Sequence, residues 1–167
     1  MLDTVCKKLE RGEDVAPELL DKAVDFIRTF ADRCHHGKEE DLLFPLMEER
    51  ELPKKSGPTA VMRTEHEDGR RFVRVMAGAI DRYRGGERGA VGELISNARG
   101  YINLLSQHIP KEDNILYPMA RQFITPTDER ELLEKFEKVE KERIGEGKHE
   151  EYACLVEVLE EELGAKA

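Results

Sequence analysis

The chain carries one short motif twice, 73 residues apart, at 35–46 (HHGKEEDLLFPL) and 108–119 (HIPKEDNILYPM). Both copies fit His-x-x-Lys-Glu-[Glu/Asp]-x-[Leu/Ile]-Leu-[Phe/Tyr]-Pro-[Leu/Met], so a His precedes a Glu by four residues in each. On an α-helix this spacing brings both side chains to one face. Two facing helices with such pairs can hold metal ions between them, so the motif predicts a metal site in a helical bundle. The two pairs are His35 with Glu39 and His108 with Glu112.

The rest of the chain predicts an all-α fold. Charged residues make up 38% and aromatic residues 6%, which favours helices over sheets. Apolar residues recur at helical spacing and nowhere alternate with a period of two, so no sheet is expected. We expect residues 1–124 to form an up-down four-helix bundle and residues 125–167 to add one or two helices packed on the same domain. The expected helices are 1–12, 17–45, 58–84, 87–122, 125–143 and 148–163, with a Pro- and Gly-rich linker at 51–59.

The helical phase separates inward-facing from outward-facing candidates. At 100° per residue, His35 and Glu39 lie on the flank of the apolar stripe, whereas His36 and Glu40 point toward solvent. On the third and fourth expected helices, His66 falls on an apolar seam, and the second His/Glu pair lies on the apolar face. The candidate metal ligands are His35, Glu39, His66, His108 and Glu112, with His149 and His36 as weaker candidates. Tyr101, two turns before His108, is either a neighbour of the site or a core aromatic residue.

Buried carboxylates strengthen the metal interpretation. A single His on an apolar face is usually a hydrogen-bonded core residue, but two buried Glu side chains without compensating charge would cost several kcal/mol. Two divalent cations would supply that charge. Imidazole and carboxylate ligands without a thiolate suit iron, manganese or zinc. The ferritin-like Glu-x-x-His pattern occurs only once, at Glu146, and the zincin pattern His-Glu-x-x-His fails at Arg70.

Other function classes find little support. The net charge is −9 without a long basic run, so nucleic acid is not an expected partner. No segment approaches the ~20 apolar residues of a membrane span, and no signal-peptide pattern opens the chain, so a cytoplasmic location is expected. The three Cys residues are expected to be reduced thiols. No nucleophile, phosphate loop or dinucleotide motif predicts an enzyme, although weak oxidase- or peroxidase-like activity at a metal site stays open.

Four segments resemble the hemerythrin-like, HHE cation-binding domains: HHGKEEDLLFP, TEHEDGR, HIPKEDNILYP and the late HEEY. The resemblance implies a four-helix bundle that holds a non-haem di-iron centre, for which zinc or manganese could substitute. It implies that Glu39 and Glu112 bridge the irons and that His35, His66 and His108 are terminal ligands. Members of that family bind dioxygen or nitric oxide, sense oxygen or redox state, or deliver iron for iron–sulfur cluster repair.

The chain departs from the family pattern in its first helix, which usually carries a His ligand. No His precedes His35 here. The resemblance therefore implies that this ligand lies upstream of Met1 or has been lost. After a loss, His149, His36 or solvent would fill the position, or the site would hold one metal or none. Three functions stay open: a protein that binds metal and a small ligand, an iron donor, and a helical interaction or regulatory module with a degenerate site. A homodimer or a complex with a partner protein also stays open.

Overall fold

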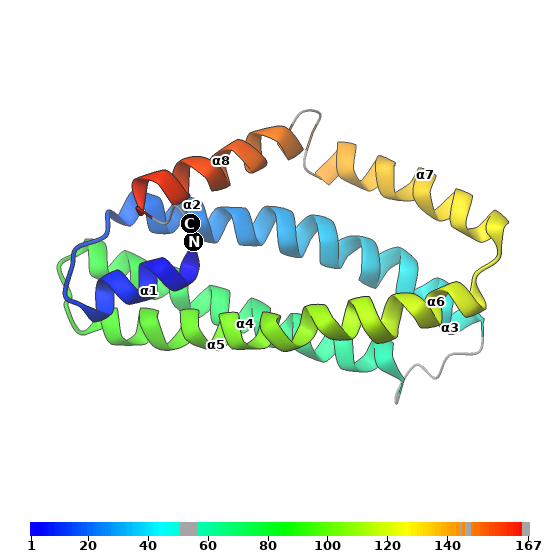
Figure 1. The fold of residues 1–167 in the computed structure, drawn as a ribbon, viewed down its shortest axis with the longest axis horizontal. Coiled ribbons are helices and arrows are strands. Elements are labelled where there is room, and N and C mark those ends of the chain that lie inside the picture. The colour runs from blue at the N-terminus through cyan, green and yellow to red at the C-terminus, as the bar shows by residue number, and fades with distance from the viewer. Residues whose placement is uncertain (51–56, 144, 146–147, 165–167) are drawn as a thin grey trace.

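The computed structural model describes residues 1–50, 57–143, 145 and 148–164. Every regular element in these residues is a helix, which confirms the predicted all-α class (Figure 1). No helix in this part of the chain is long and apolar enough to cross a bilayer. Most of the expected linker, residues 51–56, lies outside the described residues. The elements are α1 (Leu2–Glu10), α2 (Pro17–Phe26), η1 (Ile27–His36), η2 (Glu39–Leu43), α3 (Phe44–Glu49), α4 (Pro58–Arg84), α5 (Ala90–Lys111), η3 (Glu112–Leu116), α6 (Tyr117–Phe123), α7 (Pro126–Arg143) and α8 (Lys148–Glu162).

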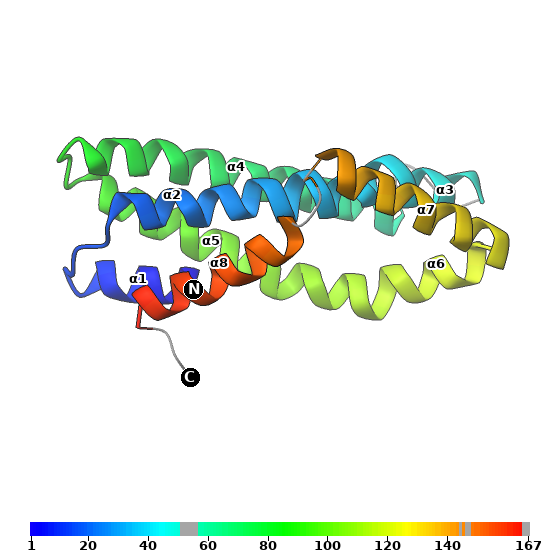
Figure 2. The same cartoon turned by 90° about the horizontal axis from the view of Figure 1, so that it is seen from above.

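Several elements join end to end into long rods. The elements α2, η1, η2 and α3 follow one another as one rod, and α5, η3 and α6 form another (Figures 1 and 2). The single helix α4 packs most extensively against α5 and also against α2, while α1 lies on α5. The late helices α7 and α8 run back along the outside, where α7 contacts η1 and η2 and α8 contacts α2. An ion pair of 2.6 Å between Lys38 and Glu140 ties α7 to the first copy of the motif.

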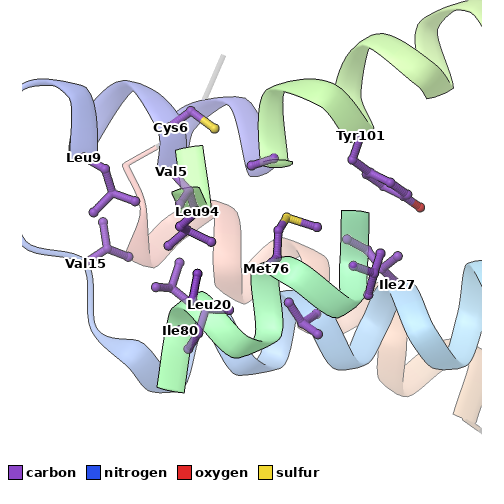
Figure 3. Close-up of a cluster of buried hydrophobic side chains, with 14 of the residues drawn as sticks. Val5, Cys6, Leu9, Val15, Leu20, Ile27, Met76, Ile80, Leu94 and Tyr101 are labelled. Carbon is purple, nitrogen blue, oxygen red and sulfur yellow. The ribbon is translucent and has the colours of Figure 1, made fainter. Parts of the chain in front are cut away.

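Two apolar clusters fill the interior. The larger one brings together residues of α1, α2, α4 and α5, including Leu20, Met76, Ile80 and Leu94, each at most 2% exposed (Figure 3). The smaller one lies at the other end of the rods and includes Phe44, Met47, Met62 and Leu116. Along each rod the candidate ligands fall between the two clusters. The polar site is therefore a layer with apolar packing above and below it, which limits access of water.

Both copies of the motif contain a π-helical segment that the sequence did not predict. Each segment begins at the motif's Glu and ends directly before an aromatic-Pro pair, Phe44-Pro45 in one copy and Tyr117-Pro118 in the other. A proline inside an α-helix lacks a hydrogen-bond donor and its ring clashes with the carbonyl four residues earlier. The wider π turn relieves that clash, so the rod continues through Pro45 instead of ending there. The sequence repeat is thus also a structural repeat.

Candidate metal centre

Among the described residues, six side chains from the two long rods and from α4 meet in the polar layer between the apolar clusters. Five of them are buried, with exposed fractions between 1% and 6%. The sixth, His35, lies at the edge, and its side chain is 43% exposed. Burying so many ionisable groups in one place requires compensation by charge or by hydrogen bonds. The buried five are His36, Glu39, His66, His108 and Glu112.

These six residues form two groups of three possible metal ligands. In each group one nitrogen or oxygen atom of every member lies within 4.8 Å of the others. Three donors around one point are typical of the protein part of a metal site that keeps a position for an exogenous ligand. The first group is His36, His66 and His108, and the second is His35, Glu39 and Glu112.

The two carboxylates lie between the groups. Glu112 Oε1 is 2.8 Å from His108 Nε2 and 3.4 Å from His35 Nε2. Glu39 Oε2 is 3.3 Å from His66 Nε2 and 3.8 Å from His35 Nε2. Each carboxylate therefore touches a histidine of the first group and the single histidine of the second.

Within the part of the chain that the structure describes, three buried atoms at this point have no hydrogen-bond partner. They are Glu39 Oε2, His66 Nε2 and His108 Nε2, and the close approach of Glu112 to His108 is not aligned as a hydrogen bond. One unpaired buried polar atom costs about 1–3 kcal/mol, and more when it is charged. Carboxylate oxygen and imidazole nitrogen are both metal ligands. The donor set therefore fits a bound cation, which would satisfy all three atoms at once.

In each histidine of the first group, the Nδ1 atom, which faces away from the unpaired atoms, contacts a carboxylate. An Nδ1–H that donates to a carboxylate leaves Nε2 as the atom that can bind metal, and it also fixes the orientation of the ring. Metal-binding histidines almost always have such a partner. The three pairs are His66 Nδ1 with Glu40 Oε1 at 2.7 Å, His108 Nδ1 with Glu65 Oε2 at 2.8 Å, and His36 Nδ1 with Asp32 Oδ1 at 3.3 Å.

A cationic side chain supports each of these outer carboxylates. Arg70 donates from Nε to Asp32 Oδ1 (2.7 Å) and from Nη2 to Glu40 Oε1 (3.0 Å). Burial alone would raise the pKa of both carboxyl groups, but their hydrogen-bonded histidines and the Arg70 charge lower it. Lys111, in the second copy of the motif, pairs with Glu65 in the same way. The outer carboxylates are therefore held in their charged form, as acceptors.

The inner groups also influence one another's protonation. Burial would raise the pKa of Glu112, but the imidazoles of His108 and His35 lower it to about 2. Hydrogen bonding to Glu112 raises the pKa of His35. Burial opposes protonation of His108, yet Glu112 and Glu65 outweigh burial and raise its pKa. Burial lowers the pKa of His36. The carboxylates thus attract positive charge to the point where the unpaired atoms meet.

The prediction that His36 and Glu40 face solvent was wrong. His36 is 6% exposed, and its ring stacks on that of His66, with ring centroids 3.8 Å apart and planes 9° from parallel. Glu40 accepts hydrogen bonds from His66 and Arg70. The error has a physical cause: Ile27–His36 is π-helical, and a π turn holds more residues than an α turn. A projection at 100° per residue therefore points these side chains in the wrong direction.

Sequence reasoning missed the outer carboxylates and their cationic partners, and it also missed one aromatic neighbour, Tyr117. Tyr117 Oη donates to Glu39 Oε1 at 2.9 Å, and burial together with Glu39 raises the pKa of the phenol. Its signal was present, because Tyr117 occupies the aromatic position of the second motif copy, where the first has Phe44. Tyr101 instead packs in the larger apolar cluster. The side chain of His149 lies outside the described residues.

Helix α1 does not supply a ligand. It contains no His, and it lies against the earlier part of α5, where Asp3 pairs with Arg99. Arg99 precedes His108 by nine residues, which is about 13 Å along a helix. The exposed side of His35 accordingly has no covering side chain from α1.

Comparison with known proteins agrees with this geometry. The family model described as the hemerythrin HHE cation binding domain matches residues 1–120. The uncharacterized protein Rv1995 of Mycobacterium tuberculosis is 26% identical over 158 residues, which are 95% of this chain and 61% of that protein. The iron-sulfur cluster repair protein YtfE of Edwardsiella ictaluri is 32% identical over 116 residues, 68% of this chain and 52% of that protein. No solved structure matches.

The chain thus spans between about half and three fifths of the length of these curated relatives. Its matched region contains all six residues of the polar layer. The donor set, the unpaired atoms and the family match agree on one conclusion. The chain belongs to the hemerythrin HHE cation-binding family and is a metal-binding member of it.

Proposed function

We propose that this chain is a non-haem di-iron protein with the up-down four-helix arrangement of the hemerythrin type. His36, His66 and His108 would hold one iron, and His35 the other, with Glu39 and Glu112 shared between the two. The observation that carries the proposal is the meeting of three unpaired buried atoms, Glu39 Oε2, His66 Nε2 and His108 Nε2. Zinc or manganese could occupy the same ligands, because imidazole and carboxylate accept all three metals.

The proposed function is the binding or sensing of a small molecule such as dioxygen or nitric oxide. Bound iron would supply the electrons and the open coordination position that such ligands require. The chain's own residues would orient the ligands and restrict water. The carboxylates behind the histidines fix the ring orientations, Tyr117 holds Glu39, and the two apolar clusters close the layer on both sides. The exposed edge at His35 is where a small molecule would enter.

The proposal is tested by measuring bound metal in the protein purified without added metal and after anaerobic reconstitution with iron(II). We expect about two irons per chain. His66→Ala removes a ligand and the partner of Glu40, so it should lower metal content strongly. Its matched control is Glu67→Ala, one position along, because the Glu67 side chain is 60% exposed. Two variants with equal metal content would show that His66 is not a ligand. A reconstituted protein without metal would leave the degenerate interaction module as the better explanation.

A second candidate is iron donation for iron–sulfur cluster repair, which the similarity to the iron-sulfur cluster repair protein YtfE and the 43% exposure of the His35 side chain both favour. A metal held partly by an exposed ligand is released faster than one that is fully enclosed. The rate of iron transfer to a chromogenic chelator should then be biphasic, with one fast and one slow iron. His35→Ala should remove the fast phase only. A single slow phase in the wild-type protein would favour binding or sensing instead.

A further inference from the structure

A cavity of about 210 Å³ opens beside the polar layer, between η1 and α4. Its buried wall consists of Ile27, Gly69, Val73 and Tyr101, with the buried His36 at the side nearest the metal ligands. Ile27 and Tyr101 lie on facing helices at one end of the larger apolar cluster (Figure 3). An apolar cavity of ~150 Å³ is enough to bind benzene. This one has room for a small apolar group with a polar substituent.

The mouth of the cavity is cationic, on a chain whose net charge is −9. Of the described residues, four arginines line it, together with one carboxylate, that of Asp32. Two of the arginines are already used by the protein, since Arg70 pairs with Asp32 and Arg74 pairs with Glu67 at 2.9 Å. The remaining two are Arg28 and Arg33.

Neither Arg28 nor Arg33 has an acidic partner within the described part of the chain. A guanidinium group presents several donors in a planar fork that matches a carboxylate. In an acidic protein, two unpaired arginines at the entrance of an apolar cavity would repel cations and attract anions. A bare inorganic oxyanion would leave the apolar wall unused. An organic acid would match both parts of the cavity.

We propose that this cavity binds a small organic carboxylate of about benzoate size, with its apolar body against Ile27, Val73 and Tyr101 and its carboxylate at Arg28 and Arg33. This site is separate from the metal ligands of the proposed function, although His36 borders both. Occupation of the cavity places an organic acid against the ring of one proposed metal ligand. Binding of a metabolite acid could thereby influence the metal site through His36.

The test is calorimetric titration of benzoate into the iron-reconstituted protein and into protein treated with chelator. We expect benzoate to bind both forms, at least tenfold more tightly than benzyl alcohol, which has the ring without the charge. The double variant Arg28→Gln/Arg33→Gln should weaken benzoate at least tenfold, which corresponds to about 1.4 kcal/mol. The matched control Arg121→Gln/Arg130→Gln removes the same charge from exposed positions outside the cavity and should change affinity less than twofold.

Four results would overturn the proposal: no benzoate binding, equal binding of benzyl alcohol, equal effects of the two double variants, or tighter binding of inorganic phosphate than of benzoate. Benzoate that binds only the iron-loaded protein would also overturn it, because that pattern means ligation of the metal. Failure of the metal proposal is measured separately, as absent iron in a protein that still binds benzoate. The two proposals can therefore fail independently.

Discussion

Replacing Glu39 by Gln should have opposite effects with and without metal. Glu39 Oε2 is buried and unpaired, and it lies 3.3 Å from His66 Nε2, which is also unpaired. A Gln side chain has the same shape, keeps an oxygen for Tyr117, and can place an N–H against His66 Nε2. The substitution removes a buried charge and joins two unpaired atoms, so the metal-free protein should become more stable. The metal-loaded protein should lose a shared ligand.

The magnitude follows from the cost of unpaired groups. An unsatisfied buried polar atom costs about 1–3 kcal/mol, so Glu39→Gln should stabilise the metal-free protein by about 2 kcal/mol. For a chain of this length that is a rise in melting temperature of roughly 4–8 °C. Wild-type protein should gain about 2.7 kcal/mol when free metal is 100 times the Kd. The variant should lose most of this gain. Thermal and urea unfolding, with chelator and with iron(II) or zinc, measure both quantities.

The matched control is Glu40→Gln, at the adjacent position. Glu40 already accepts hydrogen bonds from His66 Nδ1 and Arg70 Nη2. Removing its charge weakens both bonds, so Glu40→Gln should destabilise the protein with and without metal. The reasoning is refuted if Glu39→Gln destabilises the chelator-treated protein as Glu40→Gln does. Glu39 would then belong to an ordinary buried ion-pair network.

Three further predictions concern the same layer. Tyr117→Phe removes the hydrogen bond to Glu39 and should lower metal affinity about tenfold, measured by competition with a chelator; unchanged affinity would deny Tyr117 a positioning role. The pKa of Glu112 lies at about 2 in the folded protein, below its ordinary value of 4.5. The charged carboxylate therefore stabilises the metal-free protein fully above pH 4.5, and this stabilisation disappears as the pH falls toward 2. Glu112→Gln should therefore cost at most about 3 kcal/mol near neutral pH and almost nothing near pH 2 in urea unfolding; a cost independent of pH would contradict this. His35→Ala should reduce bound metal from two ions to one, whereas loss of both ions would show that the two positions are not separable.

Local sequence rules predicted much of the helical framework. The third helix was expected over 58–84 and spans Pro58–Arg84, because an N-terminal Pro, a regular apolar seam and a terminal glycine pair mark both ends. The same rules brought His66 to the interior. They failed at Ile27–His36, where the helix is π-helical and the phase differs from that of an α-helix. His36 and Glu40 were therefore assigned to the wrong face.

The sequence by itself determined the helical class, the repeated His/Glu pair and the need to compensate buried carboxylates, since each depends only on residue type and short-range spacing. Tertiary structure decided which histidines share a site, because that depends on the relative rotation of separate rods. It also decided which groups hold these ligands from outside. Glu65 contacts His108, 43 residues away in the sequence, and Tyr117 contacts Glu39, 78 residues away. Such contacts join side chains on different helices, and no periodicity within one helix encodes them.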